Sequence, residues 1–126
     1  MKFKAICENH LYQKAYTKGK RAVLPSVAVY VLPDYQAKRI AKARPDKRTV
    51  NRIGLTVSTK LGGAVVRSRV RRILRAALQD VYREGRVKTG FLIVVAARGA
   101  AVNMKSTEMT ADIRRAFDRL SLIVHV

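Results

Sequence analysis

The feature that most constrains the fold is the run from Lys60 to Arg75, where a double glycine precedes five arginines within nine residues. At about 100° per residue, seven apolar side chains fall on one stripe of a helix: Val66, Val70, Ile73, Leu74, Ala77, Leu78 and Val81. The opposite side carries Ser68, Arg69, Arg71, Arg72 and Arg75. Such a helix can pack on a core with one face and present arginines with the other, an arrangement that suits a phosphate backbone.

The charge of the whole chain supports this interpretation. Lys and Arg number 27 against 8 acids, a formal net charge of +19, while 48% of residues are hydrophobic. The apolar content excludes a disordered basic tail, and self-repulsion at this charge favours a polyanionic partner. Residues 35–79 hold 13 basic residues and one acid, whereas a merely solvated helix face would mix both signs. A membrane surface is disfavoured because the apolar stripe is small and β-branched.

Length and composition predict one domain over residues 1–126 in a reducing, cytoplasmic setting. The chain is long enough for one hydrophobic core and too short for two. Cys7 is the only cysteine, no 18-residue apolar run occurs, and Met1–Lys4 lacks the apolar stretch of a secretory signal.

Periodicity predicts an α/β (α+β) two-layer sandwich, in which helices pack on a central mixed sheet. The predicted elements are a helix at 8–18, a strand at 21–32 interrupted at Pro25–Ser26, a strand at 52–58, a helix at 64–83, a strand at 91–97 and a helix at 107–120. Ser106 or Thr107 is expected to cap the last helix. The continuous apolar strand at 91–97 is expected to be central. A basic loop over 33–50 separates the two earlier strands.

Two strand faces stand out. Val27, Val29 and Val31 share one face of their strand, which leaves Tyr30 on the other. Ile53, Leu55 and Val57 are expected to point to the core, so the opposite face presents Arg52, Gly54, Thr56 and Ser58. Tyr12 and Tyr16 lie one helical turn apart. These tyrosines could stack on nucleotides or simply pack in the core, and the residues alone do not choose between the two.

Candidate catalytic and metal-binding groups are scarce. His10 and His125 lie near the two ends, no carboxylate pair has catalytic spacing, and no Cys/His cluster has metal-ligand spacing. Gly62–Gly63 lacks the pattern of a phosphate-binding loop. No Asn or Gln, the side chains that read DNA bases beside arginine, lies among the arginines of residues 67–75, which favours recognition of structured RNA over DNA.

The segment Arg52–Arg75 resembles the signature of the bacterial ribonuclease P protein component, approximately RxGxSVSKKxGxAVxRNRxKRxxR. Residues 12–19 are similar to that family's first helix, and Phe91–Arg98 to its strand ending in an Ala-Arg pair. The resemblance implies a fold like the second domain of ribosomal protein S5, with a left-handed βαβ crossover where general rules favour the right-handed form. It also implies two partners, the catalytic RNA of ribonuclease P and the 5′ leader of precursor tRNA.

The resemblance assigns roles to particular side chains. Binding of the catalytic RNA is implied for Arg67, Ser68, Arg69, Arg71, Arg72 and Arg75. Binding of the leader is implied for Tyr12, Tyr16, Tyr30, Arg52, Thr56, Ser58 and Lys60. Ser68 stands where the family has Asn, and Thr59 replaces the first of two lysines.

In this family the RNA performs the endonucleolytic hydrolysis, so the resemblance implies no catalytic residue on the protein. Mg²⁺ is expected to be held mainly by RNA phosphates. The protein is expected to have no membrane or small-molecule partner. The alternative function is a non-catalytic, ribosomal-type protein that binds structured RNA.

Overall fold

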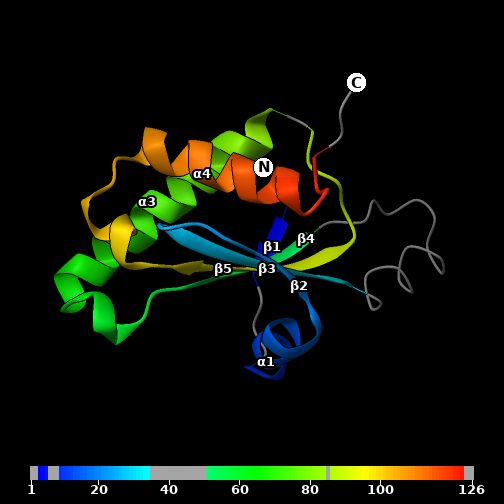
Figure 1. Cartoon of the computed structure of the whole chain (residues 1–126), viewed down its shortest axis with the longest axis horizontal. Helices are drawn as coiled ribbons and strands as arrows, with labels where there is room; N and C mark the ends of the chain where they lie inside the picture. Colours follow the sequence, from blue (N-terminus) through cyan, green and yellow to red (C-terminus); the bar gives the residue numbers. More distant parts are fainter. Residues whose placement is uncertain (1–2, 6–8, 35–50, 85, 124–126) are drawn as a thin grey trace.

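A five-stranded mixed sheet, with strand order β1-β4-β5-β3-β2, forms the centre of the fold (Figure 1). The computed structural model describes residues 3–5, 9–34, 51–84 and 86–123. In chain order the elements are β1 (Phe3–Ala5), α1 (Asn9–Lys18), β2 (Lys20–Val23), β3 (Val27–Pro33), β4 (Asn51–Thr56), the 3₁₀ turn η1 (Thr59–Leu61), α3 (Ala64–Arg83), β5 (Phe91–Ala97), the 3₁₀ turn η2 (Gly99–Asn103) and α4 (Ser106–Arg119).

The central strand is β5, as its continuous apolar sequence predicts. It lies parallel to β4 on one side and antiparallel to β3 on the other. Its residues 92–95 are all buried, because helices cover both faces of the sheet here. The neighbours β4 and β5 are joined through α3, which makes the parallel βαβ unit that the family resemblance implies. The left hand of this crossover stays a prediction.

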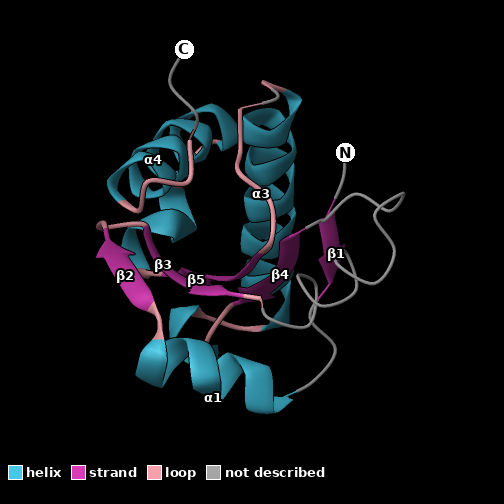
Figure 2. Cartoon of the chain, turned by 90° about the vertical axis from the view of Figure 1, so that its right-hand side faces the viewer, coloured by secondary structure: helices cyan, strands magenta, loops and turns pink. Residues whose placement is uncertain are grey.

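Helices lie on both faces of the sheet (Figure 2). The larger core packs α3 and α4 against one face, and Phe117, Leu74 and Ile93 are fully buried within it. On the other face α1 packs Leu11 and Ala15 against β5. The predicted α+β sandwich is confirmed, and α1 adds a partial third layer to it.

Strand alternation explains how the sheet serves both cores. Val27, Val29 and Val31 are buried in the larger core, whereas Tyr30 packs against the smaller core under α1. The prediction that Tyr30 lies on the face away from the valines is confirmed. This alternation places a tyrosine beside a helix that itself carries tyrosines.

Three local features differ from the sequence-based predictions. Strand β1 was not predicted, although it pairs in parallel with β4. The interrupted strand at 21–32 is a hairpin of two antiparallel strands, β2 and β3. The expected caps Ser106 and Thr107 are wrong, because Lys105 is the N-cap of α4 and its backbone N–H donates to Glu108 Oε1 at 3.2 Å. Of the predicted basic loop 33–50, residues 35–50 lie outside the described part of the chain.

A buried polar cluster joins β4 to the end of α3. The Asn51 side-chain amide donates to the Tyr82 hydroxyl at 2.5 Å and to the Lys88 carbonyl at 2.8 Å. Its Oδ1 accepts from the Phe91 backbone N–H at 3.0 Å. Asn51 is fully buried, so these bonds satisfy a group that would otherwise destabilise the fold.

Burial raises the pKa of Tyr82 to about 12, although the hydrogen bond from Asn51 acts in the opposite direction. Between about pH 10 and pH 12 the unfolded chain has lost this proton and the folded chain keeps it. We therefore expect the free energy of unfolding to fall with rising pH in this window, by up to about 1.4 kcal/mol per pH unit. Denaturant unfolding measured from pH 9 to pH 12 should show that the free energy of unfolding falls less steeply with pH for Tyr82→Phe than for the unaltered protein. Equal slopes would contradict the raised pKa of Tyr82.

Candidate nucleic-acid interface

The connection from β4 to α3 begins the candidate interface. Ser58 caps η1 by accepting the backbone N–H of Lys60 at 3.2 Å, and both residues are exposed. Gly62 then adopts a φ of 147°, a region that side chains other than glycine rarely enter. Helix α3 follows over the predicted range, with Val70, Leu74, Ala77, Leu78 and Val81 buried. The stripe predicted from the sequence is thus the face that anchors the arginines.

Most of the arginine face is open to solvent. Arg71, Arg72, Arg75 and Ser68 are exposed, and no ion pair involves an α3 arginine between 67 and 75 among the described residues. Arg67 is half-buried, and its Nε has no hydrogen-bond partner within the described part of the chain. No acid in the described part of the chain therefore neutralises these cations through an ion pair.

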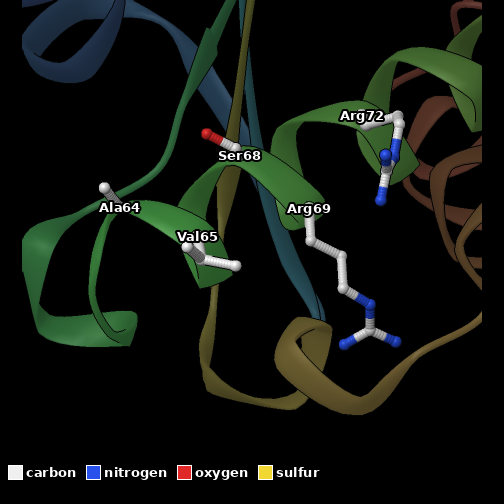
Figure 3. A pocket seen from close by; sticks show the side chains of 5 residues that line it. All are labelled: Ala64, Val65, Ser68, Arg69 and Arg72. Atoms are coloured by element: carbon white, nitrogen blue, oxygen red, sulfur yellow. The ribbon is translucent and has the colours of Figure 1, made fainter.

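Arg69 differs from the other arginines. It extends toward η2 (Figure 3), where its Nη1 donates to the Val102 carbonyl at 2.8 Å. Together with Ala64, Val65, Ser68 and Arg72 it lines a shallow pocket on the outer surface of α3. Arg69 thus ties the first turns of α3 to η2 while it lines this surface.

The acidic residues are concentrated elsewhere. Five of the eight acids occupy the C-terminal half of α3, its end and α4: Asp80, Glu84, Glu108, Asp112 and Asp118. Arg83 pairs with Asp80 at 3.1 Å, Arg114 pairs with Glu84, and Arg115 pairs with Asp112 at 3.4 Å. The positive charge is consequently left unbalanced at the N-terminal half of α3.

A second surface forms where α1 crosses the sheet. The rings of Tyr16 and Tyr30 meet edge to face, with centroids 4.9 Å apart and planes at 87°. The Tyr16 hydroxyl lies 3.5 Å from Thr56 Oγ1 on β4. Tyr16 is 38% exposed, so its ring is accessible although it packs against Tyr30.

Tyr12 completes this tyrosine surface, which consists of Tyr12, Tyr16, Tyr30 and Thr56. Its ring lies directly on Gly54 of β4, where a Cβ atom would come within 2.4 Å of the Tyr12 hydroxyl oxygen. Glycine at position 54 therefore allows the ring to lie against the strand. The structure brings these four predicted residues together across α1, β3 and β4.

Arg52 has a partner that the sequence did not reveal. Its Nε lies 2.6 Å from Asp34 Oδ2, and its Nη2 lies 2.9 Å from Asp34 Oδ1. Asp34 is 3% exposed, so this two-point ion pair also satisfies a buried carboxylate. The pair joins the end of β3 to the start of β4, on the same face as Gly54 and Thr56. No sequence pattern connects two residues that are 18 positions apart.

Nothing in the described residues gathers three or more His, Cys, Asp or Glu side chains as a metal site. None of the described helices is long and apolar enough to cross a membrane.

Comparison with known proteins decides the family. The family model named Ribonuclease P matches residues 1–121. The chain belongs to the ribonuclease P protein family. The ribonuclease P protein component of Symbiobacterium thermophilum is 32% identical over 112 residues, covering 89% of this chain and 86% of that protein. The corresponding component of Clostridium acetobutylicum is 30% identical over 125 residues, covering 99% of this chain and 95% of that protein.

Solved structures agree with this family in fold. The ribonuclease P protein of Staphylococcus aureus superposes with a TM-score of 0.75 at 22% identity, covering 95% of this chain and 97% of that one. A Thermotoga maritima ribonuclease P protein gives a TM-score of 0.58 at 17% identity, covering 91% of this chain and 92% of that one. The family predicted from the signature is confirmed, and as a ribonuclease P protein component the chain acts in tRNA processing.

Proposed function

We propose that the chain binds the catalytic RNA of ribonuclease P through α3 and the 5′ leader of precursor tRNA through the tyrosine surface. Membership of the family supports an RNA partner within an endoribonuclease holoenzyme. The observation that carries the two-surface proposal is the contrast between them. The α3 face presents arginines that form no ion pair with a described acid, whereas the other surface presents edge-to-face tyrosines beside a polar strand.

The α3 face suits a folded RNA. Guanidinium groups donate hydrogen bonds in a planar fork that matches phosphate oxygens. Arg71 and Arg75 lie one turn apart on one flank, and Arg72 is next to Arg71 on the outermost surface. Arg67, Ser68 and Arg69 extend this surface toward the start of the helix. Such an array fits the backbone of structured RNA more closely than it fits base edges.

The tyrosine surface suits single-stranded nucleotides. Every base has an aromatic face that can stack on an exposed ring, and this stacking tolerates different sequences. Tyr16 offers such a ring, while Thr56 and Ser58 add hydroxyls along β4 and its exit. Lys60 lies between this surface and α3 in the chain, so the two RNA partners would meet near it. Arg52 would act here with its guanidinium already oriented by Asp34.

Hydrolysis is assigned to the RNA and its Mg²⁺ ions, which RNA phosphates would largely hold. The protein's part is to bind, orient and screen: its cations reduce repulsion between the phosphates of substrate and catalyst. The reaction would take place in the cytoplasm, on precursor tRNA.

A magnesium titration tests this function. Leader removal by the cognate RNA should require less Mg²⁺ when the protein is present, because protein cations replace part of the ionic screening. The measurement is the cleavage rate of precursor tRNA against Mg²⁺ concentration, with and without protein. Identical titration curves would contradict the proposal. Recovery of ribosomal RNA instead of one ribozyme-sized RNA on co-purification would favour the ribosomal-type alternative.

A further inference from the structure

The register of the β2–β3 hairpin places two further side chains beside the tyrosine surface. Arg21 lies directly opposite Tyr30, and Val23 lies opposite Ala28. Residues directly opposite one another in an antiparallel pair project from the same face of the sheet. Arg21 and Val23 therefore share the α1 side with Tyr30. Between them Ala22 is buried in the larger core, as strand alternation requires.

Both side chains are open to solvent at an edge of the sheet. Val23 is 44% exposed and is one of three exposed large hydrophobic residues in the described chain, the others being Tyr16 and Val65. Arg21 is exposed, and none of the ion pairs between described residues includes it. Strand β2 thus presents a cation that pairs with no described acid, and an apolar side chain, next to the Tyr16–Tyr30 contact. Neither residue is needed to fill a core.

Resting on the function proposed above, we propose that Arg21 and Val23 extend the leader-binding surface to the β2 edge of the sheet. Arg21 binds a phosphate of the leader, and Val23 packs against a base or ribose. A single strand offers this combination at every nucleotide, an anion beside an apolar ring face. The net charge of +19 favours such a polyanion over another copy of this chain.

The test uses the assembled holoenzyme and a precursor tRNA whose leader is shortened one nucleotide at a time. With leaders long enough to reach β2, Arg21→Ala should weaken precursor binding about fivefold, the size expected for one exposed ionic contact. The defect should disappear once the leader is too short to reach the edge. The slope of log K against log salt should fall by about 0.7, the value for one phosphate contact with a single strand.

Lys20→Ala is the matched control. Lys20 is the neighbouring residue on the same edge strand, is also exposed, and lies opposite Val31, whose side chain faces the other core. Lys20→Ala removes one positive charge from the face of the sheet opposite α1. Precursor binding should therefore depend on leader length as it does in the unaltered holoenzyme. Val23→Thr keeps the shape of the side chain and should cause a smaller loss, limited to the same leader lengths.

Two results would overturn the inference: equal effects of Arg21→Ala and Lys20→Ala, or an Arg21→Ala defect that is independent of leader length. The second result would place Arg21 on the catalytic RNA or on the tRNA body. Failure of the proposed function itself looks different, because the unaltered holoenzyme would then bind precursor and mature tRNA equally well.

Discussion

Replacing Arg71, Arg72 and Arg75 together with alanine should weaken binding of the catalytic RNA on the order of a hundredfold at moderate salt. All three guanidinium groups are exposed and lack ion pairs with described residues, so their loss should remove RNA contacts and leave the core intact. Alanine also has the highest helix propensity, which preserves α3. The slope of log K against log salt should fall by about two to three if each arginine neutralises one phosphate.

A charge-matched variant separates position from net charge. Three exposed cations lie in the part of the chain that holds most of the acids: Arg86 in the α3–β5 connection, Lys105 at the N-cap of α4 and Arg119 at the end of α4. Their joint replacement with alanine removes the same three charges and should change binding of the catalytic RNA only slightly. If both triple variants lose the same affinity, net charge alone drives binding and the role of α3 is refuted.

Tyr16→Ala should weaken holoenzyme binding of precursor tRNA more than that of mature tRNA. The ring is 38% exposed and meets Tyr30 edge to face, so truncation removes a stacking surface at little cost to the core. Loss of stacking costs about 1–3 kcal/mol per base, which corresponds to roughly 5- to 150-fold in affinity. Equilibrium binding of matched precursor and mature tRNAs measures the difference directly.

Tyr16→Phe is the control for this prediction. It keeps the ring and removes only the hydroxyl, which makes a long 3.5 Å contact with Thr56. Precursor binding should therefore stay close to that of the unaltered protein. A similar loss in both variants would point to the hydroxyl and argue against stacking.

Helix α3 could be predicted from the sequence because two independent patterns coincide in it. The apolar stripe has helical periodicity, and the arginines occupy the complementary face, so burial and exposure follow together. The central position of β5 could be predicted in the same way, from a continuous apolar run. Both inferences depend on the side chains of one segment only.

Other features depend on long-range contacts that leave no local trace. Strand β1 has three residues, and its pairing with β4 joins segments far apart in the chain. The ion pair between Arg52 and Asp34 arises because β3 and β4 flank β5, a topology that periodicity does not encode. The N-cap at Lys105 was not predicted, because a Ser or Thr hydroxyl was expected to cap the helix. Instead, the side chain of Glu108 accepts the backbone N–H of Lys105.

The tyrosine surface lies between these cases. The helical spacing of Tyr12 and Tyr16 and the strand face of Tyr30 could be predicted, but packing in a core explained them equally well. Only the docking of α1 on the free face of the sheet, with Gly54 under the Tyr12 ring, brings the three together. The family resemblance supplied the expectation of a binding surface that periodicity alone could not.

The central claim is that two separate surfaces bind two different RNAs. Its most direct test is to measure two affinities for the Arg71/Arg72/Arg75 and Tyr16→Ala variants, that of the protein for the catalytic RNA and that of the assembled holoenzyme for precursor relative to mature tRNA. The arginine variant should lose affinity for the catalytic RNA. Once the holoenzyme is assembled at high concentration of this variant, it should still prefer precursor over mature tRNA. The Tyr16→Ala variant should keep its affinity for the catalytic RNA, and its holoenzyme should lose the preference for precursor over mature tRNA. A parallel loss of both affinities in both variants would contradict the separation.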